Sequence, residues 1–455
     1  MEMVLEFLRD VLSQPALLIG IMSCIGLIAL KRPFHKVMTG TLKPILGYLM
    51  LAAGAGVIVN NLDPLGKMIE HGFHITGVVP NNEAIVAVAQ KVLGVETMSI
   101  LVVGLLMNLC IARFTKFKYV FLTGHHSLFM ACLMSAVLGT AGLSGMELIL
   151  VGGFLMGAWS AISPAIGQSY TSKVTDGDEI AIGHFGSLGY YLSAWVAQYV
   201  GKAEDSTEDI EIPEKWGFLR DSTLSTALTM IVFYLIAAFA AGSEFVATLS
   251  GDMSPYLYAV MSAMNFAVGV TIVYSGVRMI LGDLIPAFQG IATKIIPNAI
   301  PAVDCAVFFT YAPTAVVLGF ISSFIGGIIG MLILGAVGGV LIIPGLVPHF
   351  FCGATAGIYG NATGGRRGAA VGAFLNGLAI TFLPALALPV LGQLGFQNTT
   401  FGDADFAVMG LVLGNAYEWV GMAGIYGIVA IAALVLIIPN FIKTKGKVIN
   451  YVEEE

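Results

Sequence analysis

The chain has 455 residues, of which 57% are hydrophobic and 11% are charged, and its formal net charge is −7. Soluble globular proteins carry about 25% charged residues, so this composition excludes a soluble protein. The charged residues form no basic face, and a role in nucleic-acid binding is therefore excluded as well.

The apolar residues are gathered in runs that recur along the whole chain. A membrane-spanning helix needs roughly 20 predominantly apolar residues, and we count about eleven segments of this kind. Clear examples are residues 16–30, 98–112, 224–241, 325–343 and 406–438. The sequence therefore predicts an all-α polytopic protein of the lipid bilayer, with one membrane domain over residues 1–455.

Lysine and arginine residues cluster between the apolar runs, at residues 31–36, 113–118, 173–220, 366–367 and 443–447. Positively charged loops stay on the cytoplasmic side of a membrane. The clusters alternate correctly if the N-terminus is outside and the C-terminus is cytoplasmic. This orientation requires an odd number of spans, which about eleven satisfies.

The longest polar insertion covers residues 201–222 and is acidic. It follows residues 190–200, whose spacing indicates an amphipathic helix rather than a clean span. We interpret the insertion as a cytoplasmic loop between two halves of the chain. Because loops often carry function, a docking surface for a cytosolic partner is the alternative.

Two stretches interrupt the helical pattern with proline and glycine, at residues 284–301 and 344–365. Non-helical backbone within a bilayer is tolerated only where protein buries it or where it lines a wet cavity. We expect two re-entrant hairpins with their tips at a binding site, and ordinary loops between short helices are the alternative. The small residues 52–56 permit either close helix packing or close approach of backbone to a ligand.

Three polar side chains stand out against these apolar surroundings. Asp304 lies within an apolar stretch, and His125 and His184 lie at the edges of two others. A carboxylate at membrane depth costs about 2.5 to 3.5 kcal/mol and marks a functional site by default. Imidazoles donate or accept hydrogen bonds and a carboxylate accepts from two hydroxyls. This set suits a neutral or weakly acidic polyhydroxylated ligand.

Signatures of soluble catalysis are missing from the sequence. It has no phosphate-binding Walker loop, no nucleophile elbow and no Cys/His spacing typical of zinc, and its five cysteines are scattered through apolar segments. We therefore expect no catalytic residue, no metal site and no cofactor.

Several short segments occur in the order found in one known family. They are Thr123-Gly-His125, Val174-Thr-Asp-Gly177 with Ile182-Gly-His184, Pro301 to Cys305, Tyr311-Ala-Pro313, Ile342-Ile-Pro-Gly345 and, more loosely, Asn361 to Arg366. Through them the chain resembles the ascorbate-type membrane permease, enzyme IIC (EIIC), of the bacterial phosphoenolpyruvate-dependent phosphotransferase system (PTS). The likeness covers nearly the whole length.

The resemblance implies a homodimer in the bacterial inner membrane. Each protomer would have a scaffold part and a transporting core with two re-entrant hairpins, and would work by elevator-like alternating access. A separate cytosolic EIIB carrying phosphocysteine, with EIIA and HPr upstream, would phosphorylate the small-molecule substrate. We expect no fused EIIA or EIIB domain, and the chain would then be the translocating subunit and not an enzyme.

The resemblance also implies the residues of the substrate site. Gly54 and Ala55 correspond to backbone contacts, and His125, His184 and Asp304 match polar positions that line the cavity. Asn82 falls near another contact.

Two positions depart from the ascorbate members, which have glutamine four residues after the first motif histidine and directly after the second. This chain has Phe129 and Phe185 there. Two lost amides remove up to about eight hydrogen-bond sites. The exchange predicts an apolar or ring-stacking wall and a substrate that is L-ascorbate or a related sugar-like compound.

Two other function classes stay open. An ion-coupled secondary transporter of a polyol or sugar acid would use the same scaffold without a phosphotransferase, and Asp304 would then carry a proton. A membrane-embedded receptor or enzyme is disfavoured, because the sequence shows neither a nucleophile–base pair nor a metal set.

Overall fold

The computed structural model describes residues 11, 14–74, 77–78, 80, 82–177, 179–210, 222–392 and 400–441. It is predominantly helical, as the composition predicts. The helices of the first half are α2 (Pro15–Ala29), α3 (Phe34–Phe73), α4 (Asn82–Phe114), α5 (Gly124–Thr140), α6 (Gly145–Thr175) and α7 (Ser187–Val200). Those of the second half are α8 (Ser222–Ala241), α9 (Ser243–Ser250), α10 (Pro255–Lys294), α11 (Pro313–Ala336), α12 (Leu346–Gly392), α13 (Ala404–Val420) and α14 (Met422–Ile437), with short 3-10 helices η2 (Cys305–Thr310) and η3 (Ile438–Phe441).

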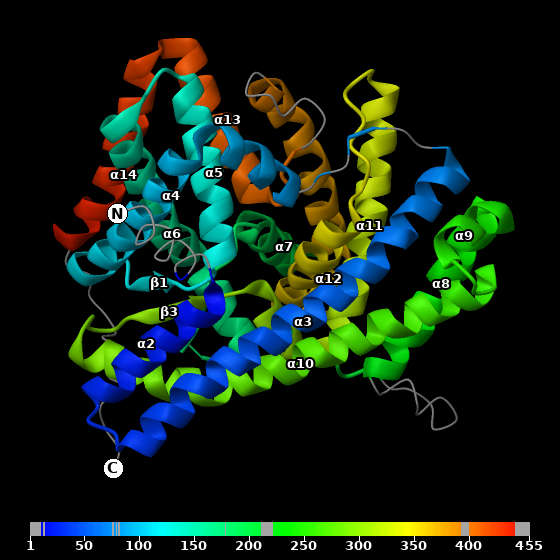
Figure 1. Cartoon of the computed structure of the whole chain (residues 1–455), viewed down its shortest axis with the longest axis horizontal. Helices are drawn as coiled ribbons and strands as arrows, with labels where there is room; N and C mark the ends of the chain where they lie inside the picture. The colour runs from blue at the N-terminus through cyan, green and yellow to red at the C-terminus, as the bar shows by residue number, and fades with distance from the viewer. Residues whose placement is uncertain are drawn as a thin grey trace.

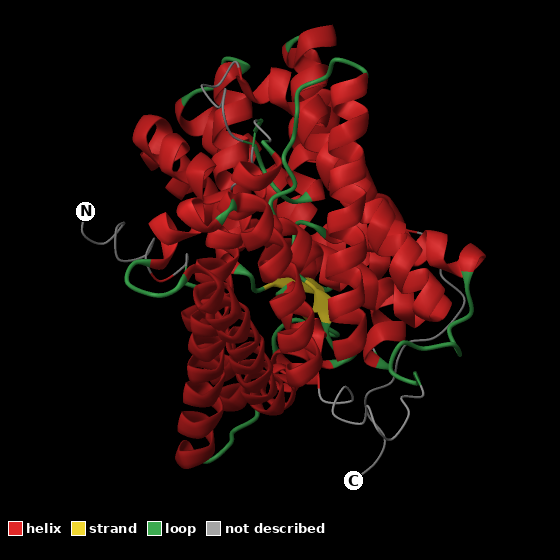
Figure 2. Ribbon diagram, turned by 90° about the vertical axis from the view of Figure 1, so that its right-hand side faces the viewer, coloured by secondary structure: helices red, strands yellow, loops and turns green. Residues whose placement is uncertain are grey.

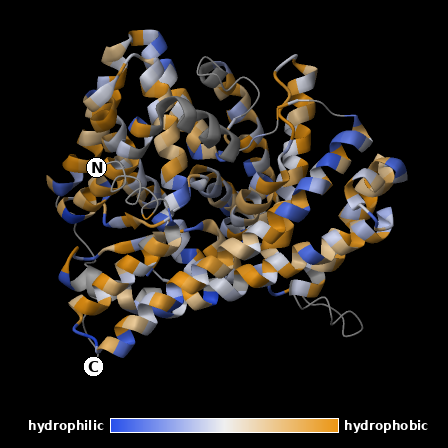
Figure 3. Ribbon diagram, viewed as in Figure 1, coloured by the Kyte–Doolittle hydropathy of each residue, from blue (hydrophilic) through white to orange (hydrophobic). Residues whose placement is uncertain are grey.

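Within the described residues, seven helices are long and apolar enough to span a membrane, or eight if the bent pair α8–α9 is counted as one span. Hydrophobic residues are frequent along the outer helices (Figure 3). The large side chains of Ile236, Phe239 and Leu332 are more than half exposed. Such surfaces suit contact with lipid. A multi-pass membrane protein is therefore confirmed, whereas the expected number of about eleven spans stays a prediction.

The helices form two groups around a small sheet. Helices α3 and α10 run side by side along the lower edge of the molecule, with α2 and α8 beside them (Figure 1). Helices α4, α5, α6, α13 and α14 lie together on the opposite side, while α7 packs against α12 and α12 against α11. The strands lie in the interior between these helices (Figure 2).

The seam between α3 and α10 is built from glycine. A Cβ added to Gly54 would lie 2.7 Å from the carbonyl oxygen of Gly269, and one added to Gly269 would lie 2.9 Å from that of Gly54. Gly47 and Gly276 face each other in the same way, one heptad along. Small residues let membrane helices approach backbone to backbone, so the close-packing interpretation of residues 52–56 applies to Gly54.

We expect Gly54→Ala to destabilise the protein, because the new methyl group would have to push the α10 backbone away. Gly56→Ala is the matched control, since Gly56 is exposed on the same helix and has no atom within 4 Å of an added Cβ. There alanine gains up to about 1 kcal/mol of helix propensity. Thermal unfolding in detergent measures both variants. If the two variants had the same melting temperature, the close packing of α3 against α10 at Gly54 would be contradicted.

The second predicted stretch, residues 344–365, contains a chain reversal at its C-terminal end. Helix α12 breaks at Gly364 and Gly365, where Gly365 has φ of 59°. A Cβ on Gly360 would collide with the carbonyl oxygen of Gly368, and the reverse holds as well. Residues eight apart in a straight helix are separated by about 12 Å, so the chain folds back on itself here.

The hairpin tip packs against the loop after α7. Arg366 donates its backbone N–H to the carbonyl of Asp205 at 2.8 Å, and a Cβ on Gly365 would collide with the carbonyl of Lys202. The reversal lies at the C-terminal end of the predicted stretch 344–365, where Gly365 supplies the positive φ, whereas the start of the stretch, with Pro344 and Gly345, lines the cavity described below. The loop, described over residues 201–210, belongs to the predicted insertion 201–222, of which residues 211–221 lie outside the described part.

The first predicted hairpin, over residues 284–301, is not formed. Helix α10 continues through Pro286 to Lys294, and the chain then turns and enters strand β3 (Ile300–Val303). A residue that precedes proline favours extended backbone, and Ile300 precedes Pro301. The proline-rich sequence therefore ends the helix and starts a strand instead of a second helix.

Three short strands were not expected from the sequence. Strands β1 (Tyr119–Phe121), β3 and β2 (Ala181–Ile182) form one parallel sheet in the order β1-β3-β2. Phe121 pairs with Ala302, and Ile182 pairs with Val303. Non-helical backbone at this depth needs internal partners for its N–H and C=O groups, and the strands supply them to one another.

Candidate functional site

The three parallel strands bring the predicted polar residues together. His125 follows β1, His184 follows β2 and Asp304 directly follows β3. Because the carboxyl ends of parallel strands meet at the same edge of a sheet, residues 59 and 120 positions apart in the chain become neighbours. The sheet is thus the element that positions the site.

His125 and Asp304 form the first contact at this edge. The Nε2 of His125 lies 3.5 Å from the Oδ2 of Asp304, and its Nδ1 lies 3.3 Å from the hydroxyl of Tyr48. The other carboxylate oxygen of Asp304 accepts the backbone N–H of Ala306 at 3.1 Å, which caps η2. A neutral His125 with its proton on Nε2 satisfies all these partners.

Backbone donors fix the ring orientation of two more histidines. Phe185 donates its N–H to Nδ1 of His126 at 3.3 Å, and Gly186 donates its N–H to Nδ1 of His184 at 3.1 Å. The hydroxyl of Tyr190 also lies 2.8 Å from Nδ1 of His184. With Nδ1 acting as the acceptor, each neutral ring carries its proton on Nε2 and offers a donor there.

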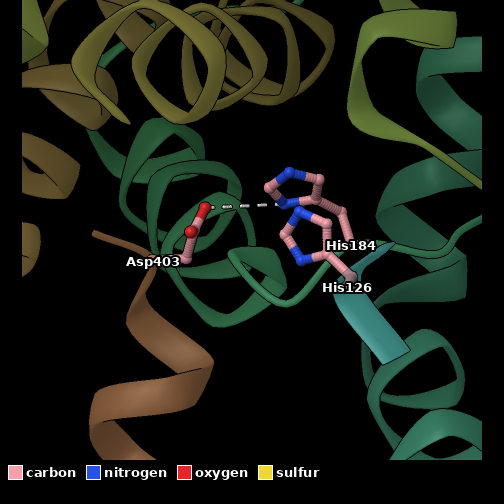
Figure 4. Close-up of side chains that lie close together, drawn as sticks. All are labelled: His126, His184 and Asp403. Atoms are coloured by element: carbon pink, nitrogen blue, oxygen red, sulfur yellow. Dashed lines mark ion pairs between the residues drawn. The ribbon is translucent and has the colours of Figure 1, made fainter. Parts of the chain in front are cut away.

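A second carboxylate lies close to the two rings. Asp403, the last residue before α13, lies with one oxygen 3.9 Å from Nδ1 of His184, as Figure 4 shows. Its Oδ2 accepts the side-chain N–H of Asn82 at 2.5 Å, and its Oδ1 accepts the thiol of Cys352 at 2.8 Å. Asn82 in turn accepts the backbone N–H of Gly402 at 2.9 Å.

The ligand atoms of His126, His184 and Asp403 lie within 4.8 Å of one another, which is close enough for a metal ion. A metal-bound histidine usually donates the N–H of its other ring nitrogen to an acceptor. Here both Nδ1 atoms already accept a backbone N–H. A metal on Nδ1 would displace that N–H, and a metal on Nε2 would put the ring proton on Nδ1, so the backbone N–H would lose its acceptor in either case. This cluster therefore favours hydrogen bonding over metal binding.

These side chains face a cavity of about 740 Å³. Of the residues predicted for the site, those that line it are Ala55, Asn82, His125, Phe129, His184 and Asp304. Gly54 faces α10 instead, and Phe185 is fully buried behind the wall. Asp63, Lys67 and Glu70 line the same cavity on α3, where Lys67 and Asp63 pair at 2.7 Å.

The two phenylalanines differ in their surroundings but share a neighbour. The ring of Phe185 stacks on Phe121 with centroids 4.6 Å apart, and it meets Phe406 edge-on at 5.6 Å. The ring of Phe129 lies 6.3 Å from Phe406 and 5.7 Å from that of His125. The predicted aromatic wall thus consists of Phe129 at the cavity, supported by Phe406 and Phe185 behind it.

Sequence reasoning missed Tyr48, His126 and Asp403, all of which line the cavity. His126 had a signal, since it adjoins His125 in the motif. Tyr48 lies six residues before Gly54 on α3 and has no such marker. Asp403 follows Gly402 at the start of an apolar run, a position typical of an ordinary helix N-cap.

The comparisons with known proteins agree with the resemblance. A family model described as EIIC-GAT, "PTS system sugar-specific permease component", matches residues 10–405. The "ascorbate-specific PTS system EIIC component" of Mycoplasma pneumoniae is 28% identical over 417 residues. That alignment covers 78% of this chain and 62% of the relative, so the chain spans less than two thirds of the relative's length.

Proposed function

We propose, since the chain belongs to the EIIC-GAT family of sugar-specific permease components of the PTS, that it translocates L-ascorbate or a related sugar-like compound across the inner membrane. The name of the Mycoplasma pneumoniae relative supports ascorbate as the first substrate to test. A cavity with carboxylate acceptors and histidine donors suits a ligand that carries several hydroxyl groups.

The observation that carries the proposal is the meeting of His125, His184 and Asp304 at the carboxyl edge of the sheet, facing the cavity. In the proposed complex Asp304 accepts hydrogen bonds from ligand hydroxyls, His184 donates from Nε2, and Ala55 and Phe129 shape the wall. Asn82 belongs to the same site through Asp403.

The proposal includes the partners that transport requires. A cytosolic EIIB with a phosphocysteine, supplied by EIIA and HPr, phosphorylates the substrate as it emerges, and this chain is the translocating subunit. We also propose a homodimer that moves by an elevator mechanism, with about eleven spans, the N-terminus outside and the loop 201–222 in the cytoplasm. The alternating basic clusters support this orientation.

Uptake of radiolabelled L-ascorbate into bacteria that express the chain tests the proposal. We expect label to accumulate as the phosphorylated compound only when EIIB is co-expressed, and a proton uncoupler to have little direct effect. If uptake persists without EIIB but collapses with the uncoupler, the chain is the ion-coupled transporter instead. No uptake of ascorbate, sugars, polyols or sugar acids under either condition would exclude both.

A further inference from the structure

We propose that Asp403 is a second substrate-binding carboxylate, and that Asn82 is the positioning residue that holds it. The inference rests on the proposed transport function and adds one binding residue to it. Asp403 reaches the cavity from the start of α13, whereas His125, His184 and Asp304 reach it from the sheet. The cavity thus has carboxylate acceptors supplied by two separate elements.

The hydrogen bonds of Asp403 leave room for a ligand. The side chain is about nine-tenths buried, and each of its oxygens accepts one bond, from Asn82 or from Cys352. A carboxylate offers about four lone-pair positions, so about half of them stay open toward the cavity. A buried carboxylate that is only partly bonded is costly unless another donor completes it. Hydroxyl groups of the ligand are donors of the right kind.

Asn82 is hydrogen-bonded twice to the segment that carries Asp403. Its amide oxygen accepts the N–H of Gly402 at 2.9 Å, and its amide nitrogen donates to Asp403 at 2.5 Å. These two bonds determine which way the amide points and tie the start of α4 to the start of α13. Asn82 therefore positions Asp403, and it lines the cavity beside it.

Binding of radiolabelled L-ascorbate to purified full-length protein tests the assignment. We expect Asp403→Asn to bind roughly 10- to 100-fold more weakly than the wild type, the cost of losing a charged hydrogen-bond acceptor. The control is the double variant Asn82→Asp with Asp403→Asn, which exchanges the two side chains. The exchanged pair can keep both the 82–403 hydrogen bond and the acceptor for Gly402, with the donor and acceptor reversed.

The exchange separates binding from structure. If Asp403 binds the ligand, the double variant regains the thermal stability of the wild type but stays weak in binding, because its carboxylate has moved to position 82. If the double variant regains binding as well, Asp403 has only a structural role and the proposal is wrong. Loss of binding in Asp304→Asn with full binding in Asp403→Asn would overturn this inference alone. A wild type that binds neither ascorbate nor any sugar, polyol or sugar acid would overturn the transport function together with it.

Discussion

Asp304→Asn is expected to weaken ligand binding by roughly 100-fold, with little change in the thermal stability of the protein. Asp304 is about nine-tenths buried, lines the cavity and lies 3.5 Å from His125. A carboxylate that accepts from two ligand hydroxyls loses one or both bonds when an amide replaces it, and hydrogen bonds to charged groups contribute about 1.5 to 3 kcal/mol each. Equilibrium binding of radiolabelled ascorbate measures the effect.

The fold is expected to tolerate this change. The Oδ1 of Asp304 accepts the N–H of Ala306 as an N-cap, and asparagine caps helices about as well as aspartate. Asp283→Asn is the matched control, since Asp283 pairs with Lys43 at 3.6 Å and does not line the cavity. If Asp304→Asn bound ascorbate as tightly as Asp283→Asn, Asp304 would not be a ligand-binding residue.

The helical, multi-pass character of the fold could be predicted from composition and apolar run length alone. The parallel sheet could not, because strands of two to four residues carry no periodic signal above that of their apolar neighbours. Yet the sheet explains why His125, His184 and Asp304 converge. The cost of placing such groups among apolar residues identified them in the sequence, while their mutual geometry depends on the pairing of β1, β3 and β2.

The misassigned elements share a physical cause, which is that glycine and proline serve several purposes. Gly54 allows α3 to touch α10, Gly365 supplies the positive φ of a chain reversal, and Pro301 favours a strand. In the sequence each was compatible with an irregular backbone near a ligand, with close helix packing as the alternative for residues 52–56 and ordinary loops as the alternative for the other two stretches. Asp403 was missed for the opposite reason. An aspartate that precedes a helix is common, and what sets Asp403 apart is its contacts with residues distant in the chain, Asn82, His184 and Cys352.

The second large effect that we expect is on stability, and it concerns Phe185 and Phe129. Phe185→Ala should lower the free energy of unfolding by about 3 to 5 kcal/mol, the usual cost of removing a buried phenylalanine ring. Phe185 is fully buried between Phe121 and Phe406, and its backbone N–H also holds His126. Phe129→Ala should cost less, since Phe129 borders the cavity and the space it leaves can be filled by water or ligand. Thermal or denaturant unfolding in detergent compares the two variants.

Glutamine substitutions of Phe129 and Phe185 distinguish a role in ligand specificity from a role in stability. Phe129→Gln places an amide on the cavity wall beside His125, and we expect it to favour ligands with more hydroxyl groups by about tenfold, the effect of one added hydrogen bond. Phe185→Gln, by contrast, buries an amide among aromatic rings and should chiefly destabilise the protein. Competition binding with ascorbate and a polyol series measures the first effect. If Phe185→Gln shifted ligand preference without loss of stability, the second ring would belong to the cavity wall rather than to its support.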